Sequence, residues 1–156
     1  MRQINCLIMA NERKKAAAVK KATKVPPIDK EIVIKAPIEK VWAALTDPKS
    51  IGAWMDDDSV KVALKVGGRY KLFGGVTTGK LTVVDEPFVL EYTWRQGEWE
   101  KGEPDTLVRW DLRPEGKKTR LRLVHSGFDD RRGRDDHDEG WDVYFLDPMK
   151  EWLESQ

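Results

Sequence analysis

The sequence predicts an α+β fold in which a curved antiparallel sheet of about six strands is covered by one long helix at the C-terminus. Two observations lead to this prediction. Residues 59–128 contain short stretches in which apolar and polar residues alternate, separated by turns rich in Gly, Pro and Asp. Helical spacing of apolar residues returns only after them. Because a sheet with one apolar face needs a covering layer, we expect the C-terminal helix to provide it.

Length and composition fit a single globular domain. The chain has 156 residues, of which 35% are charged, and its only cysteine, Cys6, cannot form an internal disulfide. Cysteine and histidine are too few for a structural zinc site, so we expect no metal and no cofactor. No apolar stretch is long enough to span a membrane or to act as a signal peptide. These features predict a soluble, cytoplasmic protein.

Charge is unevenly distributed along the chain. Residues 1–28 contain seven Lys or Arg residues and one acidic residue, Glu12, and end at Pro26 and Pro27. We interpret this segment as a flexible basic leader, followed by one domain at 29–156. The leader has other readings, as an electrostatic arm for nucleic acid or anionic lipid or as a targeting peptide. The rest of the chain is mildly acidic, so we expect no nucleic-acid binding by the folded domain.

The domain is expected to begin with one strand and two short helices. Residues 31–36 alternate and place Ile32 and Ile34 on one face, and Pro37 ends this strand. Helical spacing follows at residues 37–48, with a short second helical turn at 50–55. The apolar residues at positions i, i+3, i+4 and i+7 of the first helix are Ile38, Val41, Trp42 and Leu45.

The strands that follow are predicted from alternation alone. Their ranges are 59–66, 68–73, 80–85, 88–95, 106–114 and 119–128. The residues expected to face the interior are Val60, Val62, Leu64, Val66, Tyr70, Leu72, Leu81, Val83, Phe88, Leu90, Tyr92, Trp94, Val108, Trp110, Leu112, Leu121, Leu123 and His125.

The C-terminal helix is indicated by Trp141, Phe145 and Trp152, which share one helical face. Asp147 and Pro148 form a helix-start signal inside this stretch, which predicts a kink or a break near residue 147. The charged residues that precede the helix, 129–137, are expected to form a solvated loop.

Five segments, in this order, carry a resemblance to a known family: "IKAPIEKVWAALTDPKSIGAWM", "VGGRYKL", "LEYTWR", "VRWDLRPEGKKTRLRLVHSGF" and "GWDVYF". They resemble the START-like helix-grip superfamily and, within it, the C-terminal domain of activators of the heat shock protein 90 ATPase. The resemblance covers residues 29–155. It implies six or seven antiparallel strands wrapped around a long C-terminal helix, with a pocket that accepts apolar or polycyclic molecules in relatives. Because this fold hosts carriers, enzymes and co-chaperones, it does not fix the function.

The sequence contains seven tryptophans. A solid core of so many large rings is hard to pack, so we hypothesise a ligand cavity between sheet and helix. The alternative for each residue is that it only fills the core. The residues expected to line the cavity are Trp54, Tyr70, Tyr92, Trp94, Trp110, His125, Trp141 and Phe145.

Three functions follow from these residues. The first is binding of a small hydrophobic or aromatic molecule by a monomer or homodimer. The second is stimulation of a chaperone ATPase through the outer surface. The third is a cyclase or hydrolase reaction in which His125 acts as acid or base, although this imidazole can equally be a hydrogen-bonded core residue. His137 lies among acidic residues whose spacing fits no metal-binding motif, so we expect it in a loop with ion pairs.

Overall fold

The computed structural model describes residues 25–156. The predicted basic leader, 1–28, therefore lies outside the described residues except for its last four. Seven antiparallel strands form one sheet in the order β1-β7-β6-β5-β4-β3-β2, which confirms the predicted α+β architecture. The strands are β1 (Ile28–Ile34), β2 (Lys61–Val62), β3 (Arg69–Leu72), β4 (Thr77–Asp85), β5 (Val89–Gln96), β6 (Thr106–Glu115) and β7 (Lys118–Ser126).

Helices α2 (Ile38–Thr46) and α3 (Pro48–Met55) follow the first strand, as predicted. Asp47 separates them: its carboxylate accepts a hydrogen bond from the Lys49 amide, so it caps α3, and Pro48 occupies the first helical position. Trp42 is buried against the core, as its spacing in the sequence indicates. A short 3-10 turn, η3 (Phe73–Gly75), joins β3 to β4.

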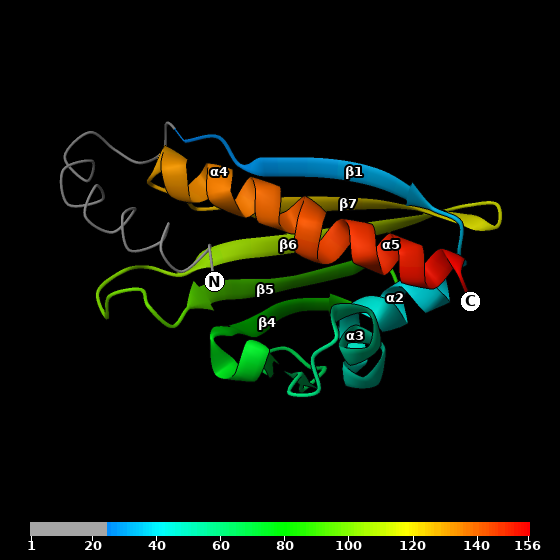
Figure 1. Cartoon of the computed structure of the whole chain (residues 1–156), viewed down its shortest axis with the longest axis horizontal. Helices are drawn as coiled ribbons and strands as arrows, with labels where there is room; N and C mark the ends of the chain where they lie inside the picture. Colours follow the sequence, from blue (N-terminus) through cyan, green and yellow to red (C-terminus); the bar gives the residue numbers. More distant parts are fainter. Residues whose placement is uncertain (1–24) are drawn as a thin grey trace.

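The C-terminal helix crosses one face of the sheet from the β1 side toward α2 (Figure 1). It consists of α4 (Arg131–Gly140), the π-helical turn η4 (Trp141–Leu146) and α5 (Asp147–Glu154), which together form 24 continuous residues. Of the predicted kink or break near residue 147, the break into two helices is therefore wrong. Pro148 has no amide hydrogen and its ring crowds the carbonyl four residues earlier. The wider turn at Trp141–Leu146 accommodates it, with the Asp147 amide donating to the Asp142 carbonyl.

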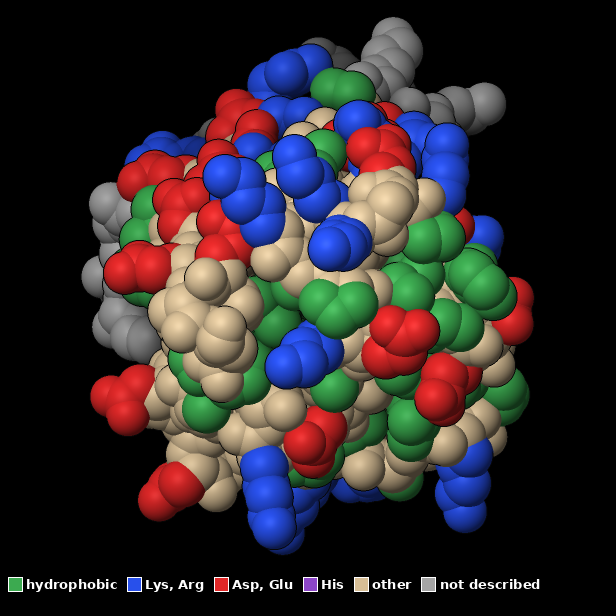
Figure 2. Space-filling view, turned by 90° about the vertical axis from the view of Figure 1, so that its right-hand side faces the viewer, with side chains coloured by type: hydrophobic (Ala, Val, Ile, Leu, Met, Phe, Trp, Pro, Cys, Tyr) green, Lys and Arg blue, Asp and Glu red, His purple; other side chains and the backbone are tan. Residues whose placement is uncertain are grey.

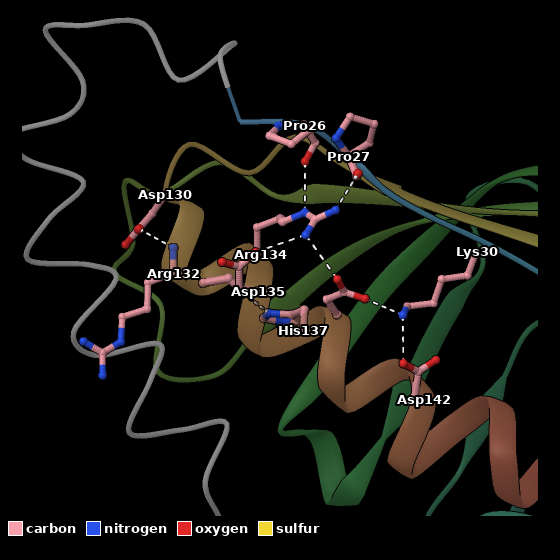
Figure 3. A network of polar contacts seen from close by, with 11 residues as sticks. Pro26, Pro27, Lys30, Asp130, Arg132, Arg134, Asp135, His137 and Asp142 are labelled. Atoms are coloured by element: carbon pink, nitrogen blue, oxygen red, sulfur yellow. Dashed lines mark hydrogen bonds and ion pairs between the residues drawn. The ribbon is translucent and has the colours of Figure 1, made fainter.

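The predicted loop at 129–137 is also wrong, because α4 begins at Arg131. The Asp130 carboxylate caps this helix by accepting a hydrogen bond from the Arg132 amide at 2.9 Å. Figure 3 shows the contacts that tie the helix to the segment before and within β1. Arg134 donates to the Pro26 and Pro27 carbonyls.

Lys30 of β1 strengthens the same attachment. Its ammonium group forms ion pairs with Asp138 of α4 and, at 2.9 Å, with Asp142 of η4. Arg134 pairs with Asp138 at 3.1 Å. Charged residues that suggest a solvated loop thus fix a helix onto an edge strand. No helix among residues 25–156 is long and apolar enough to cross a membrane.

Two strands deviate from the expected alternation. A bulge shifts the β4–β5 register between Leu81 and Val83, so Val84 packs against the core where the sequence predicts Val83. Phe88 is 48% exposed, because it lies in the turn before β5: its amide donates to the Asp85 carbonyl.

The strand predicted at 59–66 is shortened to β2, and Leu64 and Val66 are 42% and 68% exposed. A tight turn replaces the end of the predicted strand. The Lys65 amide donates to the Ala63 carbonyl, and the Gly68 amide donates to the Lys65 carbonyl. A Cβ atom on Gly68 would lie 1.9 Å from the Ala63 carbonyl oxygen, so the backbone approaches itself too closely for any side chain there.

Gly68→Ala is therefore expected to lower the free energy of unfolding by about 3 kcal/mol, since the backbone must shift to relieve the overlap. Urea denaturation would measure this change. Gly102→Ala is the matched control, because a Cβ there meets no atom within 4 Å. That variant should stay within about 0.5 kcal/mol of the parent protein. Equal losses for the two variants would contradict the steric explanation.

Candidate functional site

The structure brings all eight predicted site residues into one connected group, which we call the aromatic cluster. Each of them is at most 8% exposed. They come from six elements: α3, β3, β5, β6, β7 and η4. The members are Trp54, Tyr70, Tyr92, Trp94, Trp110, His125, Trp141 and Phe145.

The centre of the aromatic cluster is the π-turn of the C-terminal helix. The Trp141 ring lies 5.0 Å from Trp94, 5.6 Å from Trp110 and 4.5 Å from Phe145, measured between centroids. Phe145 in turn contacts Trp54 edge-on at 6.0 Å. Rings at these separations and angles have favourable edge and offset contacts. The turn η4 therefore supplies the rings that join the helix to the sheet.

Two tyrosines form the end of the aromatic cluster that lies on β3 and β5. Tyr70 and Tyr92 stack at 4.2 Å, and Tyr92 accepts a hydrogen bond from the Trp110 indole at 3.1 Å. The Tyr70 hydroxyl donates to the Leu45 carbonyl at 3.4 Å, which is long for this type of bond. Burial raises the pKa of Tyr92 to about 12 and the pKa of Tyr70 well above its ordinary value. Both side chains are therefore neutral phenols at physiological pH.

Removal of the Tyr92 hydroxyl and of the Tyr70 hydroxyl is expected to lower the free energy of unfolding by different amounts. Tyr92→Phe leaves the buried Trp110 N–H without an acceptor, so we expect a loss of about 2 kcal/mol in unfolding free energy. Tyr70→Phe removes the long bond to Leu45 and the contact with the Tyr92 hydroxyl but leaves the Trp110 N–H its acceptor, and we expect a loss below about 1 kcal/mol. Urea denaturation of the two variants in parallel tests this order. A larger loss for Tyr70→Phe would contradict it.

His125 is fully buried, and both of its ring nitrogens have partners. The Trp141 indole donates to Nδ1 at 3.0 Å. Because an indole N–H can only donate, Nδ1 carries no proton, and Nε2 donates to the Thr106 hydroxyl at 2.7 Å. The Thr106 hydroxyl in turn donates to the Trp94 carbonyl at 3.1 Å. This network fixes one neutral tautomer of His125.

His137 is a buried partner of the aromatic cluster that sequence reasoning missed. The Trp94 indole donates to its Nε2 at 3.2 Å, so its Nδ1 is protonated and donates to the Gly133 carbonyl at 2.9 Å. Its ring lies 5.4 Å from that of His125. The sequence does carry a signal: His137, Trp141 and Phe145 are spaced at i, i+4 and i+8, which continues the buried face of the helix.

Electrostatics keep both histidines uncharged. Burial lowers the pKa of His137 to about 4 and the pKa of His125 well below 6.5, and the nearby His137 adds to the effect on His125. None of the eight members of the aromatic cluster carries a carboxylate. Within residues 25–156, no three His, Cys, Asp or Glu side chains are grouped so that they could hold a metal ion. The aromatic cluster is thus an uncharged, buried group of rings whose polar atoms are hydroxyl, indole and imidazole groups.

Comparison with known proteins agrees with this architecture. The family model "Activator of Hsp90 ATPase homolog 1-like protein" matches residues 35–154. None of the curated proteins matches the chain. Protein MLL2253 from Mesorhizobium loti is a similar solved structure: the two are 29% identical over 83% of this chain and 98% of that one, with a TM-score of 0.73.

Two further solved structures are similar. CalU16 from Micromonospora echinospora is 28% identical over 81% of this chain and 75% of that one, with a TM-score of 0.70. The Aha1 dimer from Colwellia psychrerythraea is 25% identical over 82% and 96%, also with a TM-score of 0.70. These matches confirm the START-like helix-grip fold that the sequence predicts. The chain belongs to the family of Activator of Hsp90 ATPase homolog 1-like proteins.

Proposed function

We propose that the chain binds a small, uncharged hydrophobic or aromatic molecule between the sheet and the C-terminal helix. One observation carries this proposal: eight ring-bearing side chains from six elements, two of them on the π-turn of the helix, form one buried group. Small-molecule sites are lined mainly by hydrophobic and aromatic side chains with a few polar groups, which is the composition of this cluster. A π-turn inside an α-helix is frequently found at functional sites.

The chemistry of the aromatic cluster indicates the class of ligand. Its two tyrosines, its His125 and the adjoining His137 are neutral at physiological pH, so a charged ligand would find no counter-charge there. The stacked pair Tyr70–Tyr92 offers flat ring faces. The Tyr70 hydroxyl donates to the Leu45 carbonyl over a long distance and is therefore the group that can best turn to a ligand oxygen. These features favour a planar molecule with a carbonyl or hydroxyl group.

A ligand would be admitted by movement of η4. Trp141 and Phe145 close the aromatic cluster from the helix side, whereas Val143 and Tyr144 of the same turn are 48% and 45% exposed. The i→i+5 bonds of a π-turn are rarer and less regular than α-helical bonds, so this is the segment of the helix that can most readily rearrange.

The test is native mass spectrometry of the purified protein, followed by titration with 1-naphthol and hydroxyanthraquinone. We expect a co-purified small molecule or a saturable rise in melting temperature with one of the two compounds. Tyr70→Phe should weaken binding about tenfold, the worth of one buried hydrogen bond. Trp152→Phe is the control, since Trp152 lies on α5 outside the aromatic cluster and should bind as the parent does. No bound molecule, no shift and no effect of Tyr70→Phe would contradict the proposal.

Family membership favours a second candidate, stimulation of a chaperone ATPase through the outer surface. The Colwellia protein is named Aha1, and a solved structure from Plasmodium falciparum is described as an HSP90 activator. Figure 2 views the end of the molecule at which α2 and α5 lie and shows hydrophobic side chains in small groups between charged ones. Increased ATP hydrolysis by a chaperone of the heat shock protein 90 class, unchanged by Tyr70→Phe, would support this candidate.

The hydrogen bonds of His125 weigh against the cyclase or hydrolase alternative. A general base needs a lone pair that faces the substrate. The Nδ1 lone pair of His125 is occupied by the Trp141 indole, and its Nε2 proton is donated to Thr106. These bonds support the core role for His125 over acid–base catalysis.

A further inference from the structure

An open hollow lies on the opposite face of the sheet. Side chains of β3, β4 and β5 that alternate with the buried ones line an open hollow of about 290 Å³ on the outer face. We call it the outer-face hollow. Its principal side chains are Arg69, Lys71, Thr78, Lys80, Thr93 and Arg95.

Strand register concentrates positive charge in this hollow. Arg69 lies directly opposite Lys80 in the β3–β4 pair, and Lys71 lies opposite Thr78, whose other cross-strand neighbour is Arg95. Like charges directly opposite one another on a sheet are destabilising. Among residues 25–156, nothing hydrogen-bonds or pairs with the side chains of Arg69, Lys71 or Lys80. Only Arg95 has a carboxylate partner, Asp105, at 3.2 Å.

On the other half of the same outer face, three arginines have carboxylate partners. Arg109 of β6 pairs with Asp111 at 3.0 Å. Arg122 of β7 pairs with Asp29 of β1 at 2.7 Å, and Arg120 pairs with Glu31 at 2.9 Å. Each of these three arginines is matched by a carboxylate, whereas Arg113 of β6, which lies opposite Arg120, forms no ion pair with a residue among 25–156. The outer-face hollow differs in that three unpaired cations line one concave region.

Hydroxyl groups complete the hollow. Thr93 accepts the Lys80 amide at 2.9 Å through its Oγ1, which leaves the hydroxyl proton available to a ligand. Arg95 is held in place by the Glu100 and Glu103 carbonyls, each at 2.6 Å. The hollow therefore offers two guanidinium groups, of which that of Arg95 is fixed, together with two ammonium groups and threonine hydroxyls. This set of donors matches an anion that has several oxygens and more than one negative charge.

We propose that the outer-face hollow binds a small molecule that carries a phosphate ester or diphosphate group. Net positive charge remains after Asp105 is counted, and it exceeds what a single carboxylate would neutralise. A phosphate group supplies both the charge and the oxygens for Arg69, Lys71 and Lys80. The site is independent of the aromatic cluster, because the two lie on opposite faces of the sheet.

Inorganic pyrophosphate is the probe, measured by melting temperature at low ionic strength. We expect a saturable rise of about 3 °C at ten times the dissociation constant for the parent protein. Lys80→Gln and Arg69→Gln should abolish this rise. In the absence of pyrophosphate, each should melt at or above the temperature of the parent, because each removes a like-charge pair. Lys117→Gln is the control: it removes the same charge from the exposed β6–β7 turn and should respond as the parent does.

Three results would overturn the proposal. One is no saturable shift with pyrophosphate at 10 mM, a concentration at which weak phosphate sites are occupied. Another is an equal shift in all three variants, which would indicate a nonspecific ionic effect. The third is an equal response to citrate, which would assign the hollow to carboxylates instead of phosphates. Binding of 1-naphthol should be unaffected by Lys80→Gln. A negative result with pyrophosphate would therefore leave the proposed binding of an aromatic molecule untouched.

Discussion

Trp141→Ala is expected to lower the free energy of unfolding by about 5 kcal/mol. The substitution removes the ring that contacts Trp94, Trp110 and Phe145, and so leaves a large cavity under η4. It also deprives the buried His125 Nδ1 of its only donor. The loss of the buried indole ring and the buried acceptor left without a donor both lower the free energy of unfolding. Urea denaturation at pH 7.5, monitored by circular dichroism, would measure the change.

Two variants separate the contributions. Trp141→Phe keeps a ring but no donor, and we expect it to cost about 2 kcal/mol. Trp152→Ala removes a tryptophan that is only partly buried on the same helix, and it should cost less than about 2 kcal/mol. If Trp152→Ala were as damaging as Trp141→Ala, the helix would be held by its far end and not by the aromatic cluster.

The aromatic cluster could be predicted from the sequence because alternation decides which face of a strand is buried. Tyr92 and Trp94 lie two residues apart on β5, and Trp110 lies two residues from Val108, the partner of Tyr92 on β6, as period-two spacing requires. Their interior position needs no knowledge of distant parts of the chain. Helical spacing placed Trp141 and Phe145 on one face for the same reason.

Prediction failed where a backbone irregularity changes the spacing. Alternation assigns Val83 to the interior, but the β4 bulge adds one residue and turns Val84 inward. In the same way, the turn closed by Gly68 ends β2 before Leu64 and Val66 can continue it. A bulge and a tight turn depend on pairing with another strand, and the spacing of apolar residues within one segment carries no information on that pairing.

The start of the C-terminal helix depends on contacts between residues far apart in the sequence. Residues 129–137 have the composition of a loop, yet Lys30 and the Pro26 and Pro27 carbonyls, about a hundred residues earlier, hold Arg134 and Asp138 in a helix. His137 becomes buried only because that helix exists. The π-turn likewise depends on tertiary contacts and cannot be predicted from local sequence. Pro148 indicates a break, but the packing of Trp141 and Phe145 keeps the helix continuous.

Stability is expected to fall steeply as the pH decreases from 6.5 toward 4. The chain contains two histidines, and both are neutral and buried in the folded protein. Burial lowers the pKa of each below its value in the unfolded chain, about 6.5, so the unfolded state binds more protons in this range. Each histidine then contributes stability above pH 6.5 that is lost on acidification. For His137, with a pKa of about 4, the loss amounts to about 3 kcal/mol.

The slope of this dependence identifies the groups responsible. One neutral buried histidine gives a change of about 1.4 kcal/mol per pH unit, so two should approach twice that value between pH 6 and 5. The carboxylates with lowered pKa values, such as Asp29 and Glu154, lose their contributions only at lower pH. Urea denaturation at half-unit steps of pH therefore isolates the histidines.

His137→Gln should halve the slope, because glutamine does not titrate. It should also be less stable than the parent at pH 7.5, since the Trp94 N–H loses its imidazole acceptor. A structural defect alone would lower stability equally at every pH and leave the slope intact. The change in slope therefore tests the neutral state of His137 directly.

The ring centroids of His125 and His137 lie 5.4 Å apart, so a proton on either histidine opposes a proton on the other. An unchanged slope in the variant would contradict the neutral His137 that the Trp94 indole bond to Nε2 implies.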